Sequence, residues 1–183
     1  MRRAAFRSIL DGEAPDASEL ARVTVIAPDV VEDALRSLVG RGEAVVDGEN
    51  RVVGTAGLSL VPARHRLRLG EMEFHTWCAI DAIGIPAALG ADAVAHTACP
   101  TCGQPIEVAF REGQAADRDE LRAWLPTLDC CTSVVDELCP EMNLFCSEAH
   151  LEEWRRRAGH PAGVVLTVEE TEELGWRWWG GLA

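Results

Sequence analysis

Apolar residues in the first 60 positions recur first at helical spacing and then as a hairpin. Over residues 28–40, valine, alanine and leucine return every three or four positions, as on one face of a helix. Pro28 suits the first turn of that helix, and an earlier helix is expected after the cap residues at 16–18. Residues 45–53 place two valine pairs around an Asp-Gly-Glu-Asn turn, which predicts a hairpin. The order helix, helix, hairpin predicts a winged-helix-like domain over residues 1–60.

Beyond residue 57 the pattern changes to the alternation typical of strands. Polar and apolar side chains alternate over residues 65–69, and residues 92–110 read as two strands joined by a tight turn. Residues 111–123 are polar and acidic and are expected to form a surface segment. A short strand should precede a helix that begins at Ser147, followed by another strand and a C-terminal helix. We therefore predict an α+β fold, with a mixed or antiparallel sheet and flanking helices over residues 61–183.

The segment WCAIDAIGIPAALG, residues 77–90, is apolar almost throughout and predicts a buried helix. Pro86 is expected to kink or end this helix, because proline lacks the N–H that continues the hydrogen-bond ladder. Near the end of the chain, Trp176, Trp178 and Trp179 are expected to be packing residues.

Size and charge exclude several classes of protein. The chain has 183 residues, and no apolar run approaches the roughly 18 residues that a membrane helix needs. It carries a net charge of −13: residues 1–70 are balanced, and residues 71–183 hold 7 arginines against 20 acidic residues. The predicted second helix also begins with Asp29, Glu32 and Asp33, which would repel phosphates. We expect a cytoplasmic protein without a membrane or nucleic-acid partner.

Seven cysteines lie between residues 78 and 146. An odd number in a cytosolic chain argues against a disulfide framework, and favours thiol chemistry or binding of a soft metal. The seven are Cys78, Cys99, Cys102, Cys130, Cys131, Cys139 and Cys146.

Cys78 and Asp81 are three residues apart in the apolar helix and should share one face. An acid in so apolar a segment is costly unless it is paired or used, and burial should raise its pKa towards neutrality. Cys146 lies directly before the predicted helix at Ser147, where the helix N-terminus should acidify its thiol. His150, one turn later, is expected to be a supporting or simply packed histidine.

Cys99-Pro-Thr-Cys102-Gly has the shape of half a zinc-ribbon site. A structural zinc needs four ligands, and a second pair would have to come from Cys130, Cys131 or Cys139. These do not form a second C-x-x-C motif, so structural zinc at Cys99 and Cys102 is the less favoured alternative.

Four stretches together resemble the organomercurial lyases, also called alkylmercury lyases. They are GLSLVPARHRLRL, WCAIDAIGIPAALG, HTACPTCGQPIEV and NLFCSEAH. The resemblance covers most of the chain, including the winged-helix-like part, which in that family does not read DNA. The family's tyrosines are absent, since this chain has none.

The resemblance implies an active site of Cys78, Asp81 and Cys146 in the second domain, with Cys99 as a structural cysteine. Cys102, Cys130, Cys131 and Cys139 match nothing in the pattern, and serine at Cys130 or Cys139 should cost little activity. The implied reaction is protonolysis of a carbon–mercury bond in mercury detoxification, with two thiolates binding mercury and Asp81 donating the proton. Hg(II) would remain on these three residues as product, no cofactor would be required, and low-molecular-weight thiols or a mercuric reductase would accept the ion.

Two other functions remain open on the residues alone. A winged helix with a cysteine cluster would also suit a soft-metal-binding or metal-sensing protein that performs no turnover. A zinc-ribbon structural domain would instead carry zinc when purified. Release of hydrocarbon in repeated turnovers distinguishes the lyase from both.

Overall fold

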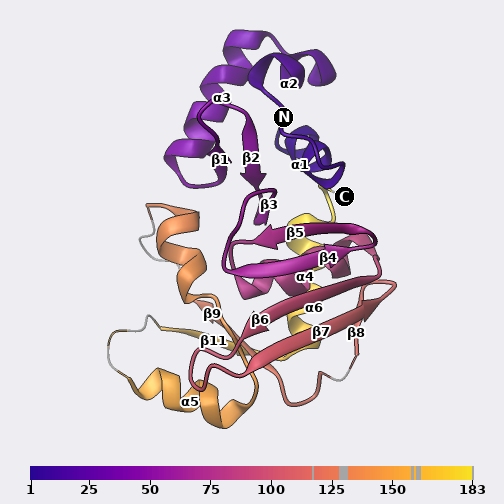
Figure 1. Ribbon diagram of the computed structural model, residues 1–183. Helices are drawn as coiled ribbons and strands as arrows, with labels where there is room; N and C mark the ends of the chain where they lie inside the picture. Colours follow the sequence, from indigo (N-terminus) through magenta and orange to yellow (C-terminus); the bar gives the residue numbers. More distant parts are fainter. Residues whose placement is uncertain (117, 128–131, 158, 160–161, 183) are drawn as a thin grey trace.

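Two antiparallel sheets and six α-helices make up the part of the chain that the structure describes (Figure 1). This computed structural model describes all residues except 117, 128–131, 158, 160–161 and 183. Cys130 and Cys131 therefore lie outside the described residues. The mixed helix and sheet composition confirms the predicted α+β class.

The N-terminal region contains three helices and a hairpin. The helices are α1 (Arg2–Leu10), α2 (Ala17–Thr24) and α3 (Pro28–Gly40), and the hairpin strands are β1 (Ala44–Val46) and β2 (Val52–Thr55). Asp16 caps α2 in a reciprocal pair with Glu19, and Pro28 opens α3, both as the sequence indicates. Helix α1 was not expected from the sequence, and it buries Phe6 and Ile9 on one face.

The β1–β2 hairpin is part of the larger sheet and forms one edge of it. The larger sheet has the order β1-β2-β3-β5-β4-β6-β7-β8, with every neighbouring pair antiparallel. Its remaining strands are β3 (Leu58–Ser59), β4 (His65–Leu69), β5 (Met72–Thr76), β6 (Ala93–Ala98), β7 (Pro105–Arg111) and β8 (Gln114–Ala115). The expected boundary at residue 60 thus falls inside one hydrogen-bonded sheet.

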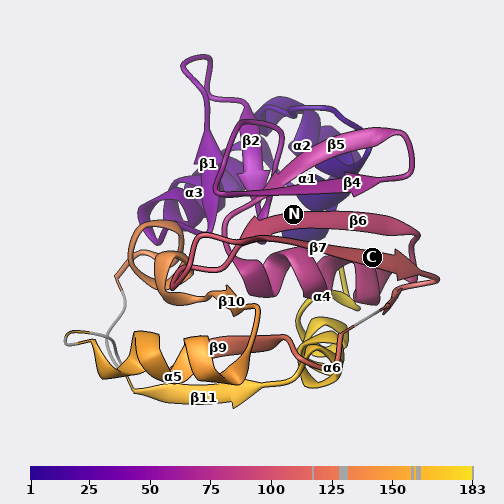
Figure 2. The same cartoon turned by 60° about the horizontal axis from the view of Figure 1, so that its bottom comes forward.

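Helix α4 (Ala79–Leu89) lies against this sheet and is almost entirely buried (Figure 2). It runs three residues past Pro86, so of the two alternatives expected there, a kink or an end, the end does not occur. Proline removes one N–H, but the helix ends only at Gly90, which takes a left-handed conformation. Helix α6 (Val168–Trp179) packs on α4, where Gly84 and Gly175 allow the two backbones to approach closely.

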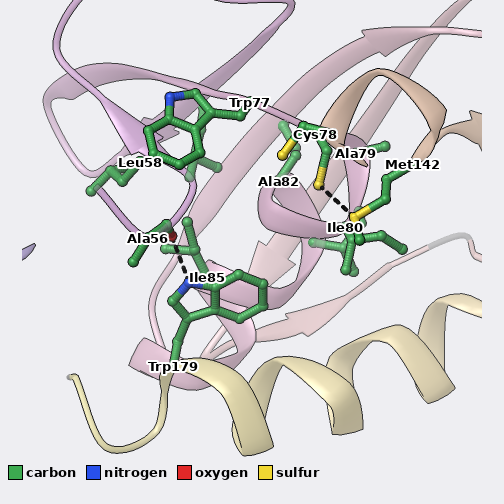
Figure 3. Packing of buried hydrophobic residues seen from close by; sticks show 14 of the residues in the cluster. Ala56, Leu58, Trp77, Cys78, Ala79, Ile80, Ala82, Ile85, Met142 and Trp179 are labelled. Carbon is green, nitrogen blue, oxygen red and sulfur yellow. Dashed lines mark hydrogen bonds between the residues drawn. The ribbon is translucent and has the colours of Figure 1, made fainter. Parts of the chain in front are cut away.

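The three C-terminal tryptophans differ in their surroundings. Trp179 is 4% exposed, and its indole N–H donates to the Ala56 carbonyl at 2.7 Å (Figure 3). Trp176 and Trp178 are 59% and 41% exposed. The expectation that all three are packing residues is confirmed for Trp179 and for Trp178, whose ring packs edge-on against Trp179 with centroids 5.5 Å apart, but not for the more exposed Trp176.

The smaller sheet has the order β10-β9-β11, formed by β9 (Arg122–Pro126), β10 (Leu144–Phe145) and β11 (Gly163–Leu166). Helix α5 (Glu148–Arg156) packs beside it and begins after Ser147, as predicted. Residues 111–123 were expected to form a surface segment, yet they contain β8 and the start of β9, where Ala115 and Ala123 are buried.

Two short helical turns precede β10: the π-helical turn η1 (Val134–Leu138) and the 3₁₀ turn η2 (Cys139–Glu141). The N–H groups of Val134 and Val135 donate to the carbonyls of Arg41 and Gly42, at 2.9 and 3.2 Å. These bonds hold η1 against the end of α3 and so fix where Cys139 lies.

No helix within the described ranges is long and apolar enough to cross a membrane.

Candidate active site

Cys78 and Asp81 cap the start of α4 together. The Cys78 sulfur accepts a hydrogen bond from the Asp81 N–H at 3.3 Å, and the Asp81 carboxyl accepts the Cys78 N–H at 2.9 Å. Both side chains are buried. The three-residue spacing in the sequence thus correctly predicts that this thiol and this carboxyl lie side by side.

The third member of this cluster is Cys139, from η2. The Cys78 sulfur, an Asp81 oxygen and the Cys139 sulfur all lie within 4.8 Å of one another. Met142 adjoins them: the Cys78 thiol lies 3.5 Å from the Met142 sulfur, and the Ala79 N–H donates to the Met142 carbonyl at 3.2 Å (Figure 3). Met142, directly after η2, is therefore joined to the start of α4, and η2 itself presents a second thiol, Cys139, to Cys78.

Burial sets the protonation of this cluster. It raises the pKa of Asp81 to about 7, while hydrogen bonds from Cys78 and from the Trp77 N–H limit the rise. This is the direction expected from the sequence. Burial also raises the pKa of Cys78 well above its usual value, and the neighbouring Cys139 and Asp81 add to the effect. Near neutral pH Cys78 is thus a protonated thiol beside a carboxyl that can hold a proton.

A cavity of about 460 Å³ reaches this cluster. Asp81, Cys139 and Met142 line it. The rest of its wall includes three tryptophans and three charged residues: Trp77, Trp178, Trp179, Arg2, Glu43 and Arg177. A larger cavity, of about 580 Å³, lies between α2, α3 and the β1–β2 hairpin and has no cysteine in its wall. Of these two cavities, the one of about 460 Å³ therefore gives access to the cluster of Cys78, Asp81 and Cys139.

Gly57 makes room for the Asp81 carboxyl. A Cβ atom at residue 57 would lie 2.3 Å from the Asp81 Cγ, and the Gly57 φ of +84° is rarely adopted by residues with side chains. Glycine at this turn is what allows the acid to sit inside the protein.

Cys146 does not join Cys78 and Asp81. The structure places its sulfur with those of Cys99 and Cys102 and with the His150 imidazole, all four donor atoms lying within 4.8 Å of one another. The three residues expected together from the sequence are thus divided between two clusters. Cys139, which was expected to matter little, occupies the position that Cys146 was expected to fill.

The expected acidification of Cys146 was also wrong. Burial raises its pKa to about 12, and hydrogen bonds with Cys99 and Cys102 act in the same direction. Burial would also raise the pKa of Cys99, but the N–H groups of Cys146, Cys102 and Thr101 bond to the Cys99 sulfur and lower its pKa to about 6. Backbone N–H groups thus favour a thiolate at Cys99 rather than at Cys146, the cysteine beside the helix in sequence.

The raised pKa of Asp81 predicts how stability depends on pH. Between the ordinary aspartate pKa of 3.8 and about 7, the folded chain keeps a proton on Asp81 that the unfolded chain loses. Folding then takes up a proton, so the free energy of unfolding should fall as pH rises, by on the order of 4 kcal/mol over this range.

This dependence can be isolated by comparing wild type with Asp81→Asn in urea unfolding across that pH range. Burial lowers the pKa of His65 to about 4, with the opposite effect on stability, but His65 is present in both proteins and cancels in the difference. The stability of wild type minus that of the variant should fall up to about pH 7 and then level off. A difference that does not change with pH would show that Asp81 titrates normally.

Comparison with known proteins points to one family. The family model "MerB: Alkylmercury lyase" matches residues 58–180. An alkylmercury lyase from Bacillus cereus is 30% identical over 176 residues, which cover 93% of this chain and 78% of that protein. One from Streptomyces lividans is 25% identical over 94% of this chain and 79% of its own length.

A solved structure has the same fold. The crystal structure of the mercury-bound form of MerB2 superposes with a TM-score of 0.90 at 28% sequence identity, covering 98% of this chain and 88% of that one.

Proposed function

The chain belongs to the alkylmercury lyase family, and from that premise we propose how its residues break a carbon–mercury bond. The observation that carries the proposal is the buried cluster of Cys78, Cys139 and Asp81, whose sulfur and oxygen atoms lie within 4.8 Å of one another. In this proposal Cys139 replaces Cys146 of the sequence-based set, because Cys146 belongs to the other cluster.

Cys139 lines the cavity and is the first thiol that an organomercurial meets there. Its sulfur displaces the thiol or halide that the mercury arrives with, and the Cys139 proton leaves with that group. A soft thiolate is a preferred ligand of a soft metal, so the exchange is favourable. The organic group then lies in the cavity, whose wall includes Trp77, Trp178 and Trp179.

Cys78 adds to the same mercury from the other side, and its proton goes to the Asp81 carboxyl as the proton of Asp81 goes to the carbon. The carbon–mercury bond breaks with its electron pair on carbon, which leaves as the hydrocarbon. The net change is R–Hg–X with two thiols giving RH, HX and mercury bound to two thiolates. Mercury does not change oxidation state. Asp81 suits general acid catalysis because its pKa of about 7 lies near the working pH.

Release of mercury requires other thiols. Two thiolates hold the ion strongly, and exchange with incoming thiols is the route that thiolate chemistry provides. We propose low-molecular-weight thiols or a mercuric reductase as acceptors, in a reducing cytoplasm that keeps Cys78 and Cys139 reduced.

The region before residue 61 has a structural part in this proposal. Its hairpin extends the sheet that carries α4, and the end of α3 holds η1 and hence Cys139 in place. The acidic residues at the start of α3 leave no basic face for phosphates there. We therefore assign residues 1–60 to support of the site, as a winged-helix-like unit that binds no nucleic acid, and residues 61–183 to catalysis.

The test is incubation of the purified protein with methylmercury and excess thiol, with methane measured in the headspace. We expect many equivalents of methane for each protein chain. Mercury bound at a fixed stoichiometry without methane would instead identify a metal-binding or metal-sensing protein.

A further inference from the structure

The second cysteine cluster brings four metal-binding side chains to one point. Cys99 follows β6, and Cys102 lies in the turn before β7. Cys146 follows β10, and His150 lies in the first turn of α5. Their three sulfurs and one imidazole nitrogen all lie within 4.8 Å of one another. None of the four has a part in the mechanism proposed above.

The distances suit a tetrahedral ion. The Cys102 and Cys146 sulfurs are 3.8 Å apart, and the Cys99 sulfur is 3.9 Å from the His150 Nδ1. Zinc bonds of 2.3 Å to sulfur and about 2.05 Å to nitrogen place two sulfurs about 3.8 Å apart and a sulfur and a nitrogen about 3.6 Å apart. The Cys146 sulfur and the His150 Nδ1 are closer, at 2.9 Å, and need move apart by less than an ångström.

The backbone holds both ligand pairs in position. In the turn, the Gly103 N–H donates to the Cys99 carbonyl at 2.8 Å, and the Cys99 N–H donates to the Gln104 carbonyl at 2.9 Å. In α5, the His150 N–H donates to the Ser147 hydroxyl at 3.3 Å. The Thr101 hydroxyl links the two segments by donating to the His150 carbonyl at 2.7 Å. The four donors are therefore brought together by bonds that need no metal.

We propose that Cys99, Cys102, Cys146 and His150 form a structural zinc(II) site that joins the β6–β7 turn to the start of α5. Three thiolates and one imidazole make a closed tetrahedral set of the kind that structural zinc uses. The sequence spacing, C-x₂-C followed later by C-x₃-H, also belongs to such sites. The missing half of the site expected from the sequence is thus Cys146 with His150, and not another cysteine pair.

Charge and access favour a cation at this point. A cavity of about 380 Å³ reaches Cys146, and Glu107, Asp119 and Glu120 lie in its wall. Their carboxylates raise the local concentration of divalent cations and lie on the route to the cluster. The catalytic cluster of Cys78, Asp81 and Cys139 differs, because it offers three donors and not four.

The test is the zinc content of protein purified without chelators, measured by mass spectrometry. Wild type should carry about one zinc for each chain, and Cys102→Ser should carry less than about a fifth of that, because a structural site needs all four ligands. Cys102 is exposed, so the substitution leaves the packed interior unchanged. Cobalt(II) in place of zinc should give the visible absorption of a tetrahedral thiolate site.

Cys78→Ser is the matched control, since it removes a thiol from the catalytic cluster, and it should keep its zinc. Zinc lost from Cys78→Ser but kept by Cys102→Ser would assign the ion to the catalytic cluster and overturn the proposal. Wild type without zinc and without the cobalt absorption would also overturn it, even if Cys102→Ser could not be purified. Methane release measures the lyase reaction separately, so failure of either proposal is recognised independently.

Discussion

Replacing Cys139 with serine should lower hydrocarbon release by on the order of 10³-fold or more, the scale on which loss of an essential nucleophile acts. A serine hydroxyl is a hard, neutral donor near pH 7, so mercury would be held by one soft ligand in place of two. The carbon would then gain too little electron density to accept a proton. Methane evolved from methylmercury, per folded chain, measures the effect.

Thermal unfolding is the control for this variant, because it shows whether the fold is kept. Serine is nearly isosteric with cysteine, and Cys139 lies in a turn anchored through Val134 and Val135, so thermal unfolding should stay close to wild type. Turnover by Cys139→Ser together with loss of turnover in Cys146→Ser would restore the set of residues expected from the sequence. Cys78→Ser should match Cys139→Ser, because both thiols bind one mercury.

Cys78 and Asp81 could be paired from the sequence because they are one helical turn apart. Within a helix, spacing determines which side chains meet, and the apolar segment around them predicts both the helix and its burial. The same argument gives the raised pKa of Asp81. Local periodicity is enough for this half of the site.

Cys139 could not be placed in the same way. It reaches Cys78 through a π-helical turn, a 3₁₀ turn and two hydrogen bonds to the end of α3. None of these features gives a periodic pattern of apolar residues in the sequence. The contact also joins residues that are 61 positions apart, so only the folded chain brings them together. The signal that could have favoured Cys139 is Met142, a second sulfur residue three positions later.

Cys146 shows that a position at a helix N-terminus does not by itself predict a lowered thiol pKa. The helix begins after Ser147, as the sequence predicts. The Cys146 thiol, however, lies beside Cys99 and Cys102, and burial together with those neighbours raises its pKa. The sequence does contain a C-x₃-H spacing from Cys146 to His150, which indicates that these two side chains meet at the start of the helix.

Replacing Asp81 with asparagine should leave mercury binding intact and slow hydrocarbon release by about 10²–10⁴-fold, the usual contribution of general acid catalysis. Asparagine keeps the size of the side chain and can still accept the Cys78 N–H through its amide oxygen, so the start of α4 should remain capped. It has no carboxyl proton to give to the carbon. Two assays on one preparation measure the effect: mercury retained after desalting, and methane evolved.

Asp33→Asn is the matched control, because it makes the same chemical change on an exposed side chain of α3, and its turnover should equal that of wild type. Normal methane release from Asp81→Asn would remove Asp81 from the role of acid and leave a thiol or water as the donor. Loss of retained mercury together with loss of methane would instead make Asp81 a mercury ligand or a structural residue. Binding without release is the result that assigns the proton to Asp81, because it separates the two thiols, which hold the metal, from the carboxyl, which completes the reaction.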